Sequence, residues 1–293
     1  MRLDDYRTSD NVGDQRGQSF GGGGFGGGGL GLILGLVASR FGILGILVVV
    51  GGAMLFGMNP LGLLGGGVQT ASPVRSGGGN AAQICAVDPA SRFSCQVLAS
   101  TEDTWARIFQ TSGEQYRPAT LVFYGGTGQS GCGAAQSAMG PFYCPSDNGI
   151  YLDTSFFQEL AQRFGAAGDF AQAYVIAHEV GHHVQYLTGV ADQVRAQQSR
   201  GSQAQANAIQ VRMELQADCY AGVWGFHNRD RMESGDLEEG LTAANAIGDD
   251  TLSKGRSSPE SFTHGTSAQR MEWLRRGYEG GDPAACDTFA TTA

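Results

Sequence analysis

The chain has 293 residues, of which 41% are hydrophobic and 16% are charged, and its formal net charge at pH 7 is -9. Lysine and arginine together number only 19 and form no dense cluster, which argues against binding to the phosphates of nucleic acid. We therefore expect no nucleic acid partner, and we interpret the acidic balance as a property of a soluble surface.

The first 80 residues are rich in glycine. The chain holds 47 glycines, and glycine-rich runs occur at residues 21–29, 65–67 and 77–79. Such runs cannot form a core, and none of them follows a strand and opens a capped helix as a phosphate-binding loop does. They predict flexible connections. We assign residues 1–29 to a polar, glycine-rich leader and residues 59–80 to a linker.

A long apolar stretch lies between these two segments. Residues 41–58 carry no charge, and residues 30–39 are apolar as well, so that only Arg40 interrupts the run. This length is typical of a transmembrane helix, and we predict a membrane anchor at residues 30–58. A cleavable signal peptide is the alternative, but a long polar leader precedes the stretch and residues 68–76 offer only a weak cleavage site.

The basic residues around this stretch predict its orientation. Four arginines precede or interrupt the apolar run, whereas Arg75 is the only basic residue in the following thirty. Positive charge is retained on the cytoplasmic side of a membrane, so we expect a single-pass protein with a cytoplasmic N-terminus. The remaining residues, 81–293, would then form one extracytoplasmic domain, either periplasmic or extracellular, with a length sufficient for a substantial core.

The cysteines favour the same compartment. All six follow the apolar stretch, and they form no CxxC pair of the kind that binds a structural metal. Close spacing favours Cys85 with Cys95 and Cys132 with Cys144, which leaves Cys219 with Cys286 among the fifteen pairings that six cysteines allow. Cys219 could also be a small buried residue.

The first part of the domain is expected to contain one helix and two strands. Residues 100–111 have a helical apolar pattern, whereas residues 120–126 and 148–153 have the β-branched and aromatic composition of strands. A helix is expected from about residue 155. The strand at 148–153 is our candidate for an exposed edge that receives a peptide substrate, with an ordinary internal strand as the alternative.

The pattern HExxH occurs at residues 178–182, in a segment expected to be helical from Asp169 to about Gly189. Residues four apart share one face of a helix, so His178 and His182 can each offer a ring nitrogen to one zinc ion. Glu179 then lies near enough to take a proton from a zinc-bound water. By chance the pattern would occur in a chain of this length with odds on the order of 1%.

A catalytic zinc needs a third protein ligand. A second helix, expected to start near Asn207, places Glu214 and Asp218 four residues apart. We interpret Glu214 as the third ligand and Asp218 as the partner that orients one zinc histidine, with two solvated helix charges as the alternative. His183 and His227 are most simply not ligands.

Two further helices are expected at residues 236–250 and 267–281. His264 lies just before the second of these helices, and it could stabilise the oxyanion of a tetrahedral intermediate, as could Arg270 or Tyr151. The alternatives are a loop histidine at 264 and a structural ion pair at Arg270. Residues 190–206 could form a helical excursion or a mobile insert over the cleft.

Several of these segments together resemble one family. HEVGHHVQ (178–185), MELQADCYAG (213–222), the segment at 132–153 and SFTHGTSAQR (261–270) are similar to the bacterial neutral zinc metallopeptidases, the YpfJ-like family, and SDNVGDQRG (9–17) extends the match to the N-terminus. The resemblance implies a membrane-anchored α+β protein with a thermolysin-like zincin domain, mainly helical with a small sheet, and a Glu third ligand. It does not imply the physiological substrate.

We therefore predict a zinc-dependent endopeptidase whose domain, residues 81–293, cleaves a peptide or protein substrate. Zn²⁺ held by His178, His182 and Glu214 activates water, and Glu179 accepts its proton and passes it to the leaving amine. The alternative function is a zinc-bearing membrane scaffold or chaperone-like protein without turnover. An intramembrane protease is set aside, because the residues flanking HExxH are too polar for a lipid-spanning helix.

Overall fold

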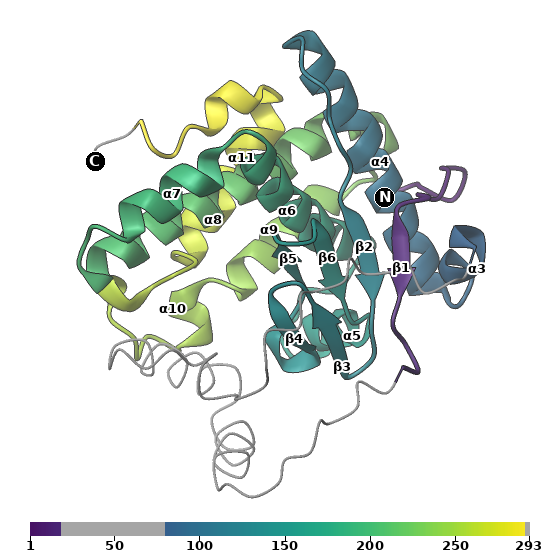
Figure 1. Cartoon of the computed structure of the whole chain (residues 1–293), viewed down its shortest axis with the longest axis horizontal. Coiled ribbons are helices and arrows are strands. Elements are labelled where there is room, and N and C mark those ends of the chain that lie inside the picture. The colour runs from purple at the N-terminus through teal and green to yellow at the C-terminus, as the bar shows by residue number, and fades with distance from the viewer. Residues whose placement is uncertain (19–79, 291–293) are drawn as a thin grey trace, which may run out of the picture.

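A four-stranded sheet and the helices around it make up the part of the chain that the structure, a computed structural model, describes: residues 1–18 and 80–290 (Figure 1). The strand order is β1-β2-β6-β5, with β5 antiparallel to its neighbour and the others parallel. A separate antiparallel hairpin is formed by β3 and β4. The strands are β1 (Val12–Asp14), β2 (Thr120–Phe123), β3 (Thr127–Ser130), β4 (Gly133–Gln136), β5 (Phe142–Cys144) and β6 (Gly149–Leu152).

Helices account for most of the described residues, as the sequence predicts. The longest are α4, α6 and α8; α6 packs against both α4 and α8, and α11 packs against α8. Short 3-10 turns occur at Ser137–Met139, Arg229–Arg231, Pro259–Ser261 and Pro283–Cys286. The α-helices are α3 (Ala81–Cys85), α4 (Pro89–Thr111), α5 (Ser155–Gln162), α6 (Asp169–Leu187), α7 (Val190–Gln198), α8 (Gln203–His227), α9 (Asp236–Ala246), α10 (Asp249–Leu252) and α11 (Ser267–Gly280).

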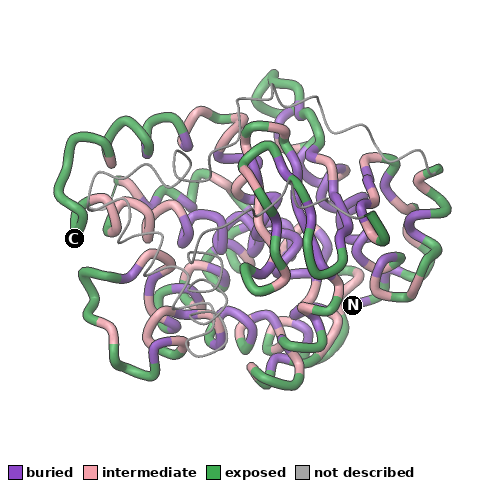
Figure 2. Tube along the Cα trace, turned by 60° about the horizontal axis from the view of Figure 1, so that its bottom comes forward, coloured by how far each residue is buried: buried purple, intermediate pink, exposed green. Residues whose placement is uncertain are grey.

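The main core lies where α4, α6 and α8 meet one another and the sheet. Trp105 of α4 and Trp224 of α8 are both almost completely buried, and Phe170 of α6 stacks on Trp224 with ring centroids 5.9 Å apart. Buried residues are concentrated in the strands and the central helices, whereas the outer turns are exposed (Figure 2). This core fixes α6 and α8 side by side, which decides where their polar residues meet.

Residues 1–18 belong to the same folded body, although residues 19–79 separate them from the rest in sequence. β1 is hydrogen-bonded to β2 in parallel register, and Leu3 is 1% exposed. The buried Glu102 of α4 accepts hydrogen bonds from Ser9 Oγ at 2.5 Å and from Asn11 Nδ2 at 2.8 Å. The N-terminal segment is therefore held both by strand pairing and by polar contacts with α4.

The prediction of an N-terminal transmembrane helix, which was part of the fold class, is wrong. A single span at residues 30–58 would hold residues 1–18 and residues 80–290 on opposite sides of a bilayer, whereas β1 and β2 are hydrogen-bonded neighbours. Within the described residues, no helix combines the length and the apolar character needed to cross a membrane. The segment predicted to be the span lies outside the described residues, as do the predicted boundaries at residues 29 and 58.

The interpretation of residues 148–153 as an edge strand is wrong, and the alternative of an ordinary internal strand is confirmed. β6, within the segment 148–153, lies between β2 and β5 and is therefore an internal strand. β5 is at the edge, and the sequence reasoning did not identify it because its three residues are too few to show an alternating pattern. α8 begins at Gln203, with a capping box between Ser202 and Gln205, so it starts four residues before Asn207.

The disulfide pairing agrees with the prediction from spacing. Cys85 is bonded to Cys95 and Cys132 to Cys144, and Cys219 is bonded to Cys286. The third bond joins the middle of α8 to the last described turn of the chain. It therefore holds the C-terminal segment against the helix that carries Glu214.

Candidate metal centre

The helix α6 carries the HExxH pattern, and its ends follow from local sequence. Gly168 precedes it with φ 119°, and the helix ends at Thr188, after which Gly189 adopts a left-handed conformation with φ 78°. Nearly every residue of the helix between its ends is buried. His178 and His182 lie on one face, with ring centroids 4.7 Å apart.

The helix α8 brings a carboxylate to these two histidines. Glu214 Oε2 lies 3.3 Å from His178 Nε2 and 3.4 Å from His182 Nε2, and Glu214 is 7% exposed. The three ligand atoms lie within 4.8 Å of one another. The structure thus brings together the three residues that the sequence selects as metal ligands. His178 and His182 come from α6, and Glu214 comes from α8.

Each histidine uses its other ring nitrogen elsewhere. His178 Nδ1 lies 2.8 Å from Asp218 Oδ1, and His182 Nδ1 lies 2.9 Å from Gln185 Oε1. Both partners are acceptors, so each Nδ1 carries a hydrogen, and the lone pair of each Nε2 points toward Glu214 once that nitrogen has lost its proton. Two lone pairs and a carboxylate that converge on one point fit a zinc ion with His₂Glu ligands and an open fourth position.

Charges inside this site agree with metal binding. Burial alone would raise the pKa of Glu214, but His182 and His178 hold the pKa of this carboxyl well below its usual range. Burial would lower the pKa of His178, yet Asp218 and Glu214 raise it to about 10. Protons therefore compete with a metal ion for His178 Nε2, and metal binding is expected to release a proton.

Glu179 is buried next to these ligands. It is 7% exposed. Burial lowers the pKa of His182, but Glu214 and, to a smaller extent, the charge of Glu179 raise this pKa above its usual value. The side chain is therefore within electrostatic reach of the metal ligands, as a general base beside a metal-bound water must be.

Asp218 is the centre of a buried polar network behind His178. It accepts hydrogen bonds from Tyr174 Oη at 2.6 Å and from Arg270 Nε at 2.8 Å, in addition to its contact with His178. Burial opposes ionisation, but mainly Arg270 lowers the pKa of Asp218 to about 2. Arg270 thus lies on the Nδ1 side of His178, away from Nε2, and makes the structural ion pair that was one of its two predicted roles.

His264 approaches the same centre from the loop before α11. Its Nδ1 lies 3.2 Å from Asp249 Oδ1, while Asp249 Oδ2 accepts hydrogen bonds from the backbone N–H groups of Thr263 and His264, each at 2.7 Å. The charge of His264 contributes to the lowered pKa of Glu214. A Cβ added at Gly265 would lie 3.1 Å from Val211 of α8, so the loop packs directly on the helix of the third ligand.

The other predicted candidates lie elsewhere. Tyr151 is fully buried in β6 and donates a hydrogen bond to Asp147 at 2.6 Å. His183 contacts Tyr143 Oη and the Arg117 carbonyl oxygen, and His227 contacts the Gly281 carbonyl oxygen, so these rings have partners outside the group formed by His178, His182 and Glu214.

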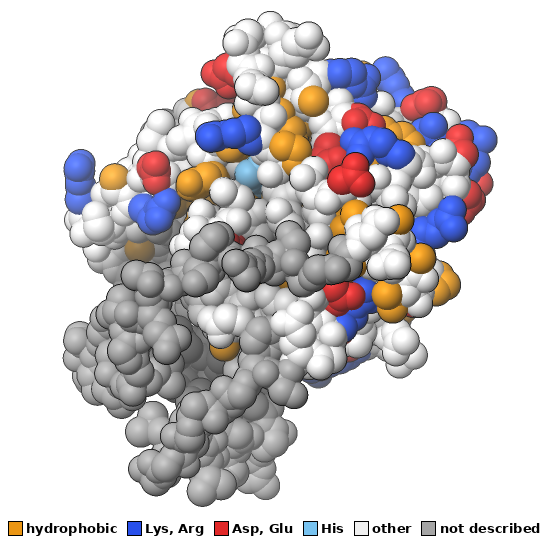
Figure 3. Space-filling model, turned by 45° about the vertical axis from the view of Figure 1, so that its right-hand side comes forward, with side chains coloured by type: hydrophobic (Ala, Val, Ile, Leu, Met, Phe, Trp, Pro, Cys, Tyr) orange, Lys and Arg blue, Asp and Glu red, His pale blue; other side chains and the backbone are white. Residues whose placement is uncertain are grey.

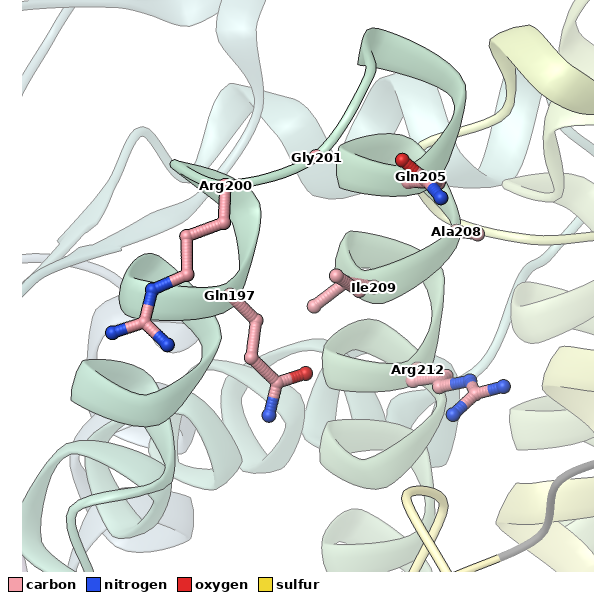
Figure 4. A pocket seen from close by; sticks show the side chains of 7 residues that line it. All are labelled: Gln197, Arg200, Gly201, Gln205, Ala208, Ile209 and Arg212. Atoms are coloured by element: carbon pink, nitrogen blue, oxygen red, sulfur yellow. The ribbon is translucent and has the colours of Figure 1, made fainter.

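Residues 190–206 form α7, a turn and the first residues of α8. A hollow of about 380 Å³ between α7 and the start of α8 is lined partly by Arg200, Ile209 and Arg212 (Figure 4). Ile209 and Arg212 lie on the face of α8 opposite Glu214, so this hollow is separate from the candidate metal centre. On the face seen in Figure 3, acidic and basic side chains are interspersed over the described surface.

A second group of acids lies at the start of α6. Carboxylate oxygens of Asp169, Asp236 and Glu239 come within 4.8 Å of one another. The Met1 ammonium group lies 2.7 Å from Asp169 and 3.1 Å from Asp236, so a positive charge already occupies this group. It is therefore an ion-pair network at the N-terminal end of the HExxH helix.

Comparisons with known proteins agree with this geometry. A family model described as "Putative neutral zinc metallopeptidase" matches residues 1–289. "Uncharacterized protein YpfJ" of Escherichia coli (strain K12) is 49% identical over 298 residues, which cover 99% of each chain. "Uncharacterized protein Rv2575" of Mycobacterium tuberculosis (strain ATCC 25618 / H37Rv) is 41% identical over 263 residues, 81% of this chain and 85% of that protein. No solved structure matches the chain.

Proposed function

Because the chain belongs to the neutral zinc metallopeptidase family, we propose that it hydrolyses peptide bonds with a zinc ion held by His178, His182 and Glu214. The observation that carries this proposal is the convergence of two histidine Nε2 atoms on one Glu214 oxygen, at 3.3 and 3.4 Å. When bound there, zinc would supply a coordinated water of lowered pKa. The substrate would be a peptide or protein, as for the family.

The protein's own residues would carry the proton transfers. Glu179 would accept the proton of the attacking water and deliver it to the leaving amine. His264 would stabilise the oxyanion of the tetrahedral intermediate. Because Asp249 accepts from His264 Nδ1, Nε2 can donate a hydrogen bond only when the ring carries a second proton.

The edge strand β5 is the best candidate for the surface that receives the substrate backbone. It is the last strand of the sheet on the side of α6, and Tyr143 of β5 hydrogen-bonds to His183, the neighbour of His182. An extended peptide added to β5 would gain main-chain hydrogen bonds close to the metal centre. This assignment replaces the internal strand β6, whose two edges are already paired.

The three disulfides support an oxidising compartment for the domain. All six cysteines are paired, and such bonds persist outside the cytoplasm. We therefore propose that the folded domain works on the extracytoplasmic side, in the periplasm or outside the cell.

Cleavage by the purified full chain tests the proposed function. The assay uses a denatured protein and a mixed peptide pool, with the zinc content measured in parallel. We expect chelator-sensitive cleavage that zinc restores, and Glu179→Gln should abolish it while zinc stays bound. Glu114→Gln, which changes an exposed glutamate, is the matched control and should cleave normally.

Two results would contradict the proposal. Zinc bound at one equivalent without any cleavage would favour the alternative of a scaffold without turnover. A folded chain that binds no zinc would overturn the assignment of the metal ligands as well as the activity.

A further inference from the structure

The two candidate zinc histidines have chemically different partners behind them. His178 Nδ1 faces the carboxylate of Asp218, whereas His182 Nδ1 faces the amide oxygen of Gln185 at 2.9 Å. Gln185 lies three residues after His182 on the same helix and is 0% exposed. A fully buried amide needs partners for its oxygen and for its NH₂ group, and those partners decide which end faces the histidine.

The partners of Gln185 fix its orientation. Its Nε2 donates to the Met213 carbonyl oxygen at 2.7 Å and to Gln216 Oε1 at 3.0 Å. A reversed amide would place its oxygen against these two acceptors and its NH₂ group against His182, so the reversed orientation is strongly disfavoured. Gln185 therefore holds His182 in the tautomer that carries hydrogen on Nδ1 and leaves the Nε2 lone pair toward Glu214.

Gln216 is oriented in turn by the end of the chain. It is 5% exposed, and its Nε2 donates to the Cys286 carbonyl oxygen at 3.0 Å. Cys286 is bonded to Cys219, three residues after Gln216 on α8. The disulfide thus anchors the carbonyl that orients Gln216, Gln216 orients Gln185, and Gln185 orients His182. We call Gln185 and Gln216 the amide relay.

An uncharged relay suits the charges already present. Glu179, Glu214 and Asp218 are three buried acids around the site, and Arg270 is the cation that pairs with Asp218. A carboxylate behind His182 would add a fourth buried negative charge with no cation beside it, which is costly in a dry site. An amide gives His182 the same acceptor without that charge.

We propose that Gln185 and Gln216 are positioning residues of the metal centre, which hold His182 ready to bind zinc through a chain of hydrogen bonds that ends at the Cys219–Cys286 disulfide. This inference rests on the proposed function, because it assumes that His182 is a metal ligand. Partners in this position behind a metal-bound histidine typically change metal affinity by about 10- to 100-fold when they are replaced.

Zinc affinity of full-chain variants, measured by competition with a chelator at fixed pH, tests the relay. Gln185→Met should weaken zinc binding by about 10- to 100-fold. Gln216→Met should weaken it by a smaller factor. The double variant should bind like Gln185→Met alone, because Gln216 acts on the metal only through Gln185. Gln193→Met, on an exposed position of α7, is the control and should bind like the wild type.

A conservative variant and a stability measurement separate positioning from folding. Gln185→Glu keeps an acceptor for His182, so it should retain more zinc affinity than Gln185→Met. Urea unfolding of the zinc-free variants shows which of them fold. If Gln185→Met does not fold, Gln216→Met still decides the question, because it leaves Gln185 Oε1 beside His182 and removes only the group that orients Gln185. Unchanged zinc affinity of Gln216→Met would then overturn the relay.

The outcomes distinguish this inference from the proposed function. A wild-type chain that binds no zinc would overturn both. A wild-type chain that binds zinc, with variants of equal affinity, would overturn the relay alone. The relay would also be overturned if the losses of zinc affinity in the two single variants multiplied in the double variant. Such independent effects would mean that Gln216 does not act through Gln185.

Discussion

Gly181 of α6 lies directly against the backbone of Ala217 of α8. A Cβ added at Gly181 would lie 2.9 Å from the Ala217 carbonyl oxygen and 3.0 Å from its Cα. Gly181 lies between His178 and His182 in sequence and faces α8. Ala217 lies between Glu214 and Asp218 on α8. The close approach of the two helices at this point is what brings the carboxylates of one within reach of the histidines of the other.

Replacing Gly181 with alanine should therefore weaken both the fold and metal binding. Alanine is a better helix former than glycine by about 1 kcal/mol, so helix propensity alone predicts stabilisation. The clash with Ala217 predicts the opposite, a loss of about 1–3 kcal/mol from overpacking, together with weaker zinc binding. Urea unfolding and chelator competition measure the two effects. Gly280→Ala, where the nearest atom lies 3.8 Å from the added Cβ, is the control and should be close to neutral.

Arg270 should be required because it pairs with a fully buried charge. Arg270→Met would leave Asp218 ionised, buried and without its cation, at a cost of about 3–5 kcal/mol in the free energy of unfolding. Tyr174→Phe removes a single hydrogen bond to the same carboxylate and should cost about 1–3 kcal/mol. Chemical unfolding of the zinc-free proteins measures both. Equal stability of Arg270→Met and the wild type would contradict the assigned network.

His264 should affect turnover without affecting metal content. If it stabilises the oxyanion, His264→Gln should lower kcat by about 100- to 1,000-fold, the usual effect of removing such a donor. Zinc affinity should stay within a few-fold of the wild type, because Glu214 and the two ligand histidines are untouched. Steady-state kinetics and zinc content measure these quantities. A large loss of zinc in this variant would instead mean that His264 supports the metal site.

The pH dependence of stability should report on Asp249. Burial raises the pKa of Asp249, but its hydrogen bonds with His264 and the neighbouring backbone lower it below the ordinary value of 3.8. A carboxyl whose pKa is lower in the folded protein stabilises the fold above pH 3.8 and loses that effect as the pH falls through the folded-state pKa. The stability difference between the wild type and Asp249→Asn should thus be constant near neutral pH and should shrink below pH 3.8. A difference that grows in acid would contradict this assignment.

The sequence predicts the residues of the candidate metal centre better than it predicts the residues that support them. His178, His182 and Glu214 could be selected because a helix places residues four apart on one face, and two of the disulfides because short spacings favour local pairs, which left the third pair by elimination. Gln185 and Gln216 could not be selected in the same way. Their partners, Met213 and Cys286, come from other elements, and glutamine carries no charge that suggests a role behind a metal ligand.

The N-terminal part of the fold was missed for a different physical reason. Residues 1–18 are mostly polar, and the glycine-rich and apolar stretches that follow suggested a leader before a membrane anchor. The single strand β1 has only three residues, and its pairing partner β2 is more than a hundred residues away in sequence. Local pattern carries no information on such distant pairing, which depends on contacts of the buried Leu3 and Ser9 and of the half-buried Asn11.

The contacts of the N-terminal segment with Glu102 should be essential for full stability. Ser9→Ala and Asn11→Ala each remove one donor from this buried carboxylate, and each should cost about 1–3 kcal/mol in the free energy of unfolding. Asp10→Ala changes the exposed residue between them and should stay within about 0.5 kcal/mol of the wild type. Urea unfolding of the full-length chains provides the comparison. If all three variants were equally stable, residues 1–18 would not be an integral part of the domain, and the argument from β1 against a single transmembrane span would fail with them.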